Sequence, residues 1–407
     1  MPPLALRRAY QPDLTPPPGE AAGPGMWECA CVDLPRPDVD PGGLIEYSVV
    51  FTDRSLNHMS TRFVAVMQDI VDVLRTTYAA ETVAVVPGGG TYAMEAVARQ
   101  LATGRRCLVV RNGLFSYRWS QIFDAGSIPS ETKVCCARPV SDDRQAPWAP
   151  PPVDEVVETI QRTRPEVVLA AHVETAAGMV LPDEYVRAVS GAAHDVGGLF
   201  VLDCIASGAL WVDMTQLGVD VLLSAPQKGW SGSPCAGFVM LGEAGRAAVT
   251  STTSTSFAAG LGTWLAVTEA YVDGRTPYHA TMPTDTLAHD AALMLETRDA
   301  GLEELRRAQT ALGGRVRALL AERGFPSVAA EGFAAPSVVV AYTDDPEIRS
   351  GASFKQAGIQ VAAGVRLMCG EGEDFSSFRI GLFGLDKLAD VDATVARLEA
   401  GLDRLDR

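Results

Sequence analysis

A lysine and an aspartate each follow a strand-like run in the middle of the chain. Lys228 lies just beyond the run Val219–Ser224, and Asp203 closes the run Leu199–Asp203. In an α/β protein, ligands bind beyond the carboxyl ends of the strands. An amine can form a Schiff base with an aldehyde, and a carboxylate can keep a pyridine nitrogen protonated, so that the ring withdraws electrons. The pair predicts a site for pyridoxal phosphate (PLP).

The chemistry of both side chains requires a partly buried site beside a cationic ring. A lysine amine with a pKa near 10.4 is mostly protonated and therefore a poor nucleophile. Partial burial beside a cationic ring lowers that pKa, because both effects disfavour the ammonium form. A buried carboxylate such as Asp203 needs a cationic partner, and a protonated pyridine supplies one.

A glycine-rich turn provides a candidate phosphate site. The segment Pro87–Thr91 reads Pro-Gly-Gly-Gly-Thr and lies between a predicted strand, Thr82–Val86, and a helix predicted over 91–103. Glycines let the backbone approach an anion, and the free N–H groups at a helix start favour negative charge. The segment has neither the Gly-Lys-Ser/Thr of a P-loop nor the dinucleotide-binding spacing. Together with Lys228 and Asp203, it predicts that the cofactor phosphate binds here.

The elements around these residues alternate between strand-like and helical patterns. Apolar residues recur on one helical face from Thr61 onward, and a further helix is predicted near Asp183–Val196. Continuous apolar strands separated by helices indicate a mostly parallel sheet that is covered on both faces. The other strands are predicted at Cys107–Arg111, Val167–His172 and Gly237–Leu241.

Three regions are predicted along the chain. Residues 1–45 form a Pro/Gly-rich arm, 46–290 a large cofactor-binding domain and 291–407 a smaller C-terminal α+β domain. The smaller domain is expected to contain a long helix, Ala291–Arg323, a strand, Ser337–Ala341, and a closing helix with apolar residues at alternating spacings of three and four.

Charge and composition exclude several classes of protein. The 407 residues carry a net charge of −16, which argues against binding to nucleic acid or to an anionic membrane surface. No apolar run is long enough for a membrane span, and no secretory signal is visible. The eight cysteines show no CxxC spacing, so reduced thiols in the cytoplasm are expected and no metal site is predicted.

Several motifs in order resemble the class V aminotransferases, the alanine–glyoxylate and serine–pyruvate branch of fold type I PLP enzymes. The resemblance implies an α/β fold with a large domain, whose mostly parallel seven-stranded sheet is covered by helices, and a smaller C-terminal α+β domain. The matching segments cover most of the chain and are Gly88–Ala96, Asn112–Arg118, His172–Gly178, Pro226–Lys228, Tyr278–Pro283 and Phe378–Gly384.

The resemblance assigns roles around the cofactor ring. It implies that Lys228 carries PLP as a Schiff base and moves the proton during the reaction, while Asp203 pairs with the pyridine nitrogen. Phe115 is expected to stack on one face of the ring, and Ile205 to pack on the other. Thr175 is placed to bond the ring hydroxyl.

The same resemblance assigns the phosphate contacts. The glycine turn contributes Gly89, Gly90 and Thr91, and Gln227 completes the set.

Further residues are expected to act between subunits or on the substrate. The resemblance implies that Tyr278 and Thr281 reach the phosphate of a neighbouring subunit, so that a homodimer with shared active sites is required. Arg379 is expected to bind the substrate α-carboxylate through a two-pronged contact that lysine does not reproduce.

One segment departs from the family pattern and leaves the reaction open. The stretch Phe51–Ser60 lacks the family's Pro-Gly-Pro, and Met59 stands where the family has arginine. Amino transfer between a small α-amino acid and a 2-oxo acid is the leading hypothesis. The alternative is β/γ-elimination, replacement or carbon–carbon bond formation on the same scaffold, because the protein selects among these fates. A PLP-sensing regulator is disfavoured, since the arm 1–45 is short and not basic.

Overall fold

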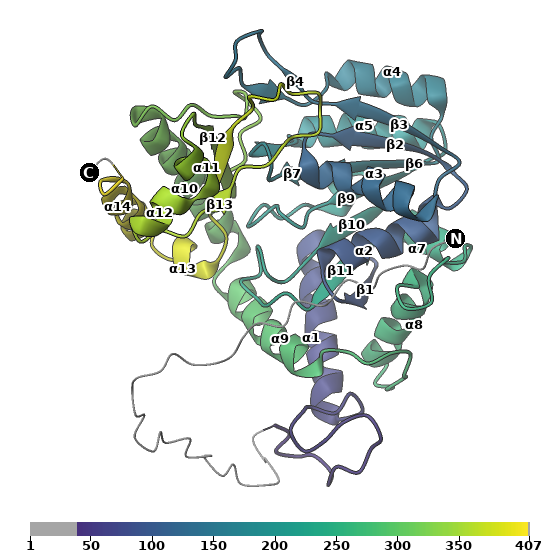
Figure 1. Ribbon diagram of the computed structural model, residues 1–407. Helices are drawn as coiled ribbons and strands as arrows, with labels where there is room; N and C mark the ends of the chain where they lie inside the picture. Colours follow the sequence, from purple (N-terminus) through teal and green to yellow (C-terminus); the bar gives the residue numbers. More distant parts are fainter. Residues whose placement is uncertain (1–38, 406–407) are drawn as a thin grey trace, which may run out of the picture.

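The computed structural model describes residues 39–405, so the predicted arm 1–45 lies largely outside the described residues (Figure 1). A seven-stranded sheet forms its centre. The strands, in spatial order, are β1 (Thr82–Pro87), β11 (Ala236–Leu241), β10 (Val221–Ser224), β9 (Leu199–Asp203), β6 (Val167–Ala171), β2 (Arg106–Arg111) and β3 (Glu131–Cys136).

The sheet is mostly parallel, as predicted. Strands β10, β9, β6, β2 and β3 pair in parallel, whereas β11 runs antiparallel to both of its neighbours, β1 and β10. Strand β1 therefore points the same way as β10, and the carboxyl ends of both lie at one edge of the sheet. Every residue of β6, β10 and β11 is buried, which requires cover on both faces.

Helices surround this sheet (Figure 1). They are α1 (Thr61–Tyr78), α2 (Gly90–Val97) with its π-helical continuation η1 (Ala98–Ala102), α3 (Leu114–Gly126), α4 (Val153–Thr163), α5 (Asp183–Asp195), α6 (Met214–Leu217), α7 (Glu243–Thr250) and α8 (Leu261–Val272). The predicted start of α1 is confirmed: the Ser60 side chain accepts a hydrogen bond from the Phe63 N–H, which caps the helix. None of the helices in residues 39–405 is both long and apolar enough to cross a membrane.

A three-stranded antiparallel sheet forms the C-terminal part, with the order β12 (Val338–Tyr342), β14 (Ser377–Gly381), β13 (Ala362–Ala363). The helices of this part are α10 (Leu302–Glu322), α11 (Pro346–Ser350), α12 (Ala352–Gln356), α13 (Leu385–Leu388) and α14 (Val391–Leu402). Four two-residue strands complete the fold: β4 (Arg138–Pro139), β5 (Trp148–Ala149), β7 (Val173–Glu174) and β8 (Met179–Val180).

The prediction of a single long helix over Ala291–Arg323 is wrong. Helix α9 (Thr284–Asp299) ends within this range, and α10 begins anew at Leu302. Gly301 separates the two with a φ of 90°, a left-handed conformation that interrupts the helical hydrogen bonds and that glycine adopts at little cost. The apolar periodicity runs through both helices, which hides the break in the sequence.

A second hydrophobic cluster lies between the two sheets. Trp148 and Val173, from segments beside the large sheet, pack in one cluster with Val340 of β12 and with Leu367 and Phe375 from the segment between β13 and β14. This cluster fixes the C-terminal sheet next to the carboxyl ends of the large sheet's strands.

Two adjacent glycines in α10 offer a test of this packing. A Cβ on Gly313 would meet the backbone of Pro336, whereas a Cβ on Gly314 would meet nothing within 4 Å. Gly313→Ala is therefore expected to lower the free energy of unfolding by about 1–3 kcal/mol. Gly314→Ala should raise it by up to about 1 kcal/mol, because alanine favours the helix. Denaturant unfolding of both variants checks this, and equal effects would contradict the proposed close approach.

Candidate active site

Asp203 and Lys228 lie at the same edge of the large sheet. Asp203 is the last residue of β9, and it sits opposite Leu223 of the parallel strand β10. The chain leaves β10 after Ser224 and reaches Lys228 four residues later, in a turn. The glycine turn after β1 leaves the sheet at this edge too, because β1 and β10 run in the same direction.

The Asp203 carboxyl group is buried, with 7% of the residue exposed. Burial raises its pKa to about 6, although a hydrogen bond from the Ile205 N–H to Oδ1 (2.9 Å) acts in the opposite direction. The nearby Glu174 carboxylate raises the pKa further, and Arg118 lowers it. A carboxylate kept in this environment favours a cationic partner, because a positive charge would offset the desolvation of its anionic form.

The Lys228 amine is partly buried, and its pKa is lowered. Burial is the main cause, and the positive charge of Arg379 adds to it. The ammonium nitrogen lies 5.0 Å from the centre of the Phe383 ring. A lowered pKa increases the fraction of neutral amine at physiological pH, which is the form that reacts with carbonyl groups.

The glycine turn forms a backbone cradle above β1. Gly88 and Gly89 have φ values of 118° and 150°, and α2 begins directly afterwards at Gly90. A Cβ on Gly90 would lie 2.6 Å from Cδ1 of Ile205. Glycine at position 90 therefore lets the Ile205 side chain pack closely against the cradle. The Thr91 hydroxyl accepts a hydrogen bond from Arg118 (3.0 Å). Backbone N–H groups at a helix start beside a guanidinium group suit an anion such as phosphate.

Two guanidinium groups lie near the Phe115 ring. Those of Arg118 and Arg379 lie 5.3 Å and 5.5 Å from the centre of its ring. Arg379 belongs to β14 of the C-terminal sheet, and its Nε donates to the Ala363 carbonyl (2.9 Å). The structure therefore brings a predicted substrate-binding residue of the C-terminal part to a predicted ring-stacking residue of the large sheet.

Glu174 is a buried residue that the sequence analysis did not single out. Its carboxylate accepts hydrogen bonds from the N–H groups of Phe115 (3.2 Å) and Ser116 (2.8 Å), and from the Ser116 hydroxyl (2.7 Å). These N–H groups belong to the first turn of α3, so Glu174 caps that helix from a distant segment. A Cβ on Gly113 would lie 2.6 Å from the Glu174 carboxyl carbon. Glu174 thus holds Phe115 in place.

Two polar residues remain available for a bound group. Thr175 is buried beside Glu174, and the buried Oε1 of Gln227 has no hydrogen-bond partner among residues 39–405. His172 is engaged elsewhere, since its Nδ1 lies 2.7 Å from the Ser207 hydroxyl, and burial lowers its pKa to about 4. The glycine cradle and the buried carboxyl group of Asp203 fit PLP, which needs N–H donors for its phosphate and an anion for its ring nitrogen.

Tyr278 and Thr281 lie on the exposed segment between α8 and α9. Their hydroxyl groups are 3.3 Å apart, and Tyr278 is 57% exposed. The Tyr278 ring contacts His58, whose ring contacts Phe51, so the divergent segment 51–60 packs against the residues predicted to act in a second subunit.

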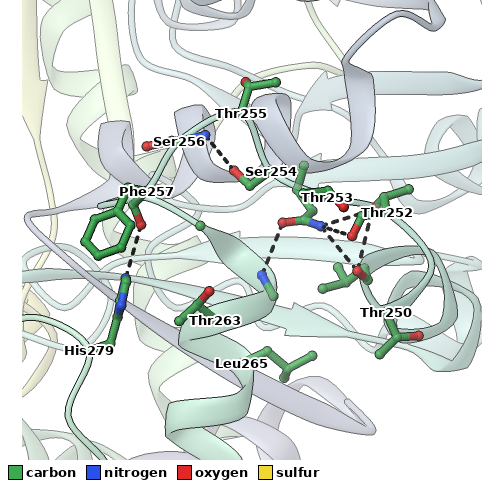
Figure 2. A pocket seen from close by; sticks show the side chains of 14 residues that line it. Thr250, Thr252, Thr253, Ser254, Thr255, Ser256, Phe257, Thr263, Leu265 and His279 are labelled. Carbon is green, nitrogen blue, oxygen red and sulfur yellow. Dashed lines mark hydrogen bonds between the residues drawn. The ribbon is translucent and has the colours of Figure 1, made fainter.

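A separate cavity of about 870 Å³ opens beside this segment (Figure 2). It is lined mainly by the hydroxyl-rich stretch 250–257, by α8 and by His279, whose Nε2 lies 3.1 Å from the Phe257 carbonyl oxygen. Lys228 and Asp203 are not among its lining residues. This cavity therefore differs from the candidate site.

Comparisons with known proteins relate most of the chain to aminotransferases. The chain is 26% identical over 341 residues to the 2-aminoethylphosphonate–pyruvate transaminase of Salmonella paratyphi B, covering 81% of this chain and 86% of that protein. The structure superposes on the alanine–glyoxylate aminotransferase of Nostoc sp. with a TM-score of 0.72 and 20% identity, over 86% of this chain and 89% of that one. The chain is an aminotransferase homologue. Its fold is that of the fold type I PLP-dependent aminotransferases.

A further relative carries a different name. The small subunit of a soluble hydrogenase from Synechococcus sp. is 28% identical over 391 residues, covering 93% of this chain and 94% of that protein. Among residues 39–405, no group of three or more His, Cys, Asp or Glu side chains is arranged to hold a metal ion. No family model matches the chain.

The raised pKa of Asp203 predicts a pH-dependent stability of this aminotransferase homologue without cofactor. The folded state binds the Asp203 proton more tightly than the unfolded state, so the contribution of Asp203 to stability is highest below pH 4 and is lost as the pH rises through about 6. Asp203→Asn should remove this loss of about 3 kcal/mol, a value that follows from a shift of roughly two pKa units. Unfolding measured from pH 4 to 7 checks this, with the exposed Asp142→Asn as control. An unchanged pH profile in Asp203→Asn would contradict the account.

Proposed function

We propose that the chain is a PLP-dependent aminotransferase that moves an amino group between a small α-amino acid and a 2-oxo acid. The observation that carries this proposal is the buried Asp203 at the strand edge that also holds Lys228 and the glycine cradle. Aminotransferases among its homologues support the reaction class. The names of these relatives favour pyruvate or glyoxylate as the acceptor.

Bound PLP would supply an aldehyde for a Schiff base with Lys228 and an electron-withdrawing ring. We propose that Asp203 keeps the proton on the ring nitrogen, because its buried carboxylate gains a cationic partner there. The Lys228 amine would act as the base that takes up the proton from the substrate α-carbon and holds it beside the site. Its lowered pKa suits this proton uptake by the neutral amine.

The remaining predicted residues would hold the ligands in place. Phe115 would stack on one face of a bound ring and Ile205 would pack on the other, while the buried Thr175 would bond the ring hydroxyl. Glu174 acts as a positioning residue, since it fixes the backbone of Phe115.

The phosphate group would bind to Gly89, Gly90, Thr91 and Gln227. Gln227 would donate from its amide nitrogen, so the amide would have to turn until its NH2 group, rather than the buried and unpaired Oε1, faces the phosphate. Arg379 would bind the substrate carboxylate, and burial lowers the pKa of its guanidinium group, which indicates a partly desolvated cation.

We propose a homodimer with shared active sites. Tyr278 and Thr281 lie on an exposed segment rather than beside Lys228, which supports contact with a second subunit. Large apolar side chains are also exposed, as expected of a subunit interface. They are Leu44, Ile45, Tyr47 and Val49, just before the segment 51–60, and Phe257, which lines the separate cavity.

Two broader proposals concern the domains of the protein and its location in the cell. We propose that 46–290 and 291–407 act as large and small domains, with the arm 1–45 ahead of them. We also propose a cytoplasmic location, because the six cysteines of the described residues are free thiols, as is usual in a reducing compartment.

The divergent segment 51–60 favours the alternative reaction class. That class comprises elimination, replacement and carbon–carbon bond formation. In this segment His58 is buried between the Phe51 and Tyr278 rings, and Met59 is exposed. Incubation with amino acids in the absence of a 2-oxo acid separates the two reactions. An aminotransferase accumulates pyridoxamine phosphate, whereas the alternative enzymes do not.

Lys228→Ala tests the proposed nucleophile. The variant should lack the absorbance band of lysine-bound PLP and lose turnover by at least about 100-fold, because no other amine replaces the proton carrier. The exposed Lys355→Ala should retain both properties. A Lys228→Ala protein with the band and full turnover would exclude the proposal.

Mixing two defective variants tests the shared site. Lys228→Ala supplies intact Tyr278 and Thr281, while a Tyr278→Ala/Thr281→Ala chain supplies an intact lysine. In a mixed dimer one of the two sites is then complete, so random exchange should restore about a quarter of the wild-type activity. If both side chains act within their own subunit, mixing would restore none.

A further inference from the structure

A pair of cysteines connects the edge of the large sheet to the C-terminal part. Cys136 is the last residue of β3, where it pairs with Arg111 of β2. Cys369 lies in the segment between β13 and β14, and its Sγ is 3.5 Å from the Arg111 carbonyl oxygen. That same oxygen accepts the N–H of Ala137, the residue after Cys136 (2.8 Å). Cys136 and Cys369 are therefore both placed against Arg111, one through the strand pairing and the other through its thiol.

The segment that carries Cys369 is held in one shape. The Glu371 carboxylate accepts hydrogen bonds from the N–H groups of Leu367 (2.7 Å), Met368 (3.0 Å) and Cys369 (2.9 Å). Met368 has a φ of 62°, a conformation that is strained for a non-glycine residue. Arg111 also donates to the Met368 carbonyl (3.3 Å). In Figure 1 the yellow segment that follows β13 reaches from the C-terminal sheet toward β3 and β4.

The environment of Cys136 favours its reactive form. The hydrogen bond from the Cys369 thiol is the main cause of its lowered pKa, and the positive charges of Arg111 and Arg138 act in the same direction against burial and Glu371. The pKa of Cys369 is raised, so the pair resembles a thiolate beside a thiol. Both residues are partly exposed, which gives a small oxidant access.

We propose that Cys136 and Cys369 form a reversible disulfide on reaction with a hydroperoxide. The Cys136 thiolate attacks the peroxide oxygen, which breaks the O–O bond and, with one proton, gives a sulfenic acid and water or an alcohol. The Cys369 sulfur then attacks the Cys136 sulfur and loses its proton, and a second water leaves as the S–S bond forms. Two thiols have lost two electrons to one peroxide.

The disulfide fastens the segment between β13 and β14 to the large sheet. Strand β14 carries Arg379, so the bond would restrict the position of a proposed substrate-binding residue. Reduction by a dithiol restores both thiols. The proposal is independent of the reaction that the enzyme catalyses, because it rests on side chains outside the PLP site.

Treatment of the full-length protein with hydrogen peroxide tests the pair directly. Two thiols per chain should be lost, non-reducing digestion should yield a peptide linking Cys136 to Cys369, and dithiothreitol should reverse both changes. Cys135→Ser is the matched control, since this neighbour points to the other side of the strand and burial raises its pKa. Cys135→Ser should form the same linked peptide.

Cys369→Ser should instead leave Cys136 as a sulfenic acid that dimedone traps. In the wild type, the oxidised form should show slower amide exchange over 366–371 than the reduced form. Three results would overturn the proposal: a disulfide that fragmentation of the linked peptide assigns to Cys135 rather than Cys136, oxidation of Cys136 to a sulfinic acid with Cys369 still free, or no loss of thiols.

Discussion

The burial of Asp203 is the constraint on which the site depends. The strand β9 lies in the middle of the sheet, so its last residue leaves the apolar core at a point where water has little access. A carboxylate at that point raises the free energy of the folded protein unless a cation accompanies it. The protein without cofactor therefore carries a destabilising carboxylate at the position where a protonated ring would be stabilised. Binding of the ring would reduce this destabilisation of the folded protein.

The other parts of the site are arranged around this carboxyl group by different segments of the chain. The glycine cradle follows β1, and close packing of Ile205 on Gly90 ties it to the residues just after Asp203. Glu174 fixes the start of α3, and with it Phe115. The second hydrophobic cluster brings β14 and Arg379 against that helix. Each contact restricts one side of the space in which a flat, anionic cofactor would lie.

Much of this could be predicted from the sequence, because the relevant signals are local. A run of apolar residues that ends in a charged side chain marks a strand end, and three glycines before a helix mark a cradle. Other features depend on contacts between distant segments. Nothing near Glu174 indicates that it caps a helix some 60 residues earlier, and Cys136 and Cys369 come together only through the packing of the C-terminal segment.

Two further errors have physical causes. Strand β3 was not predicted, because it is an edge strand whose residues are exposed or half-buried and lack the apolar run of a central strand. The break between α9 and α10 was missed, because Gly301 interrupts the backbone while the apolar spacing continues. Local periodicity reports which residues are buried, but not whether the backbone hydrogen bonds are continuous.

The most direct test of the central claim is the stabilisation that PLP gives to the wild type and to Asp203→Asn. If Asp203 pairs with a cationic ring, saturating PLP should raise the unfolding midpoint of the wild type at pH 7 substantially and that of Asp203→Asn much less. Equal increases in the two proteins would contradict the account, because the buried carboxylate would then contribute nothing to cofactor binding.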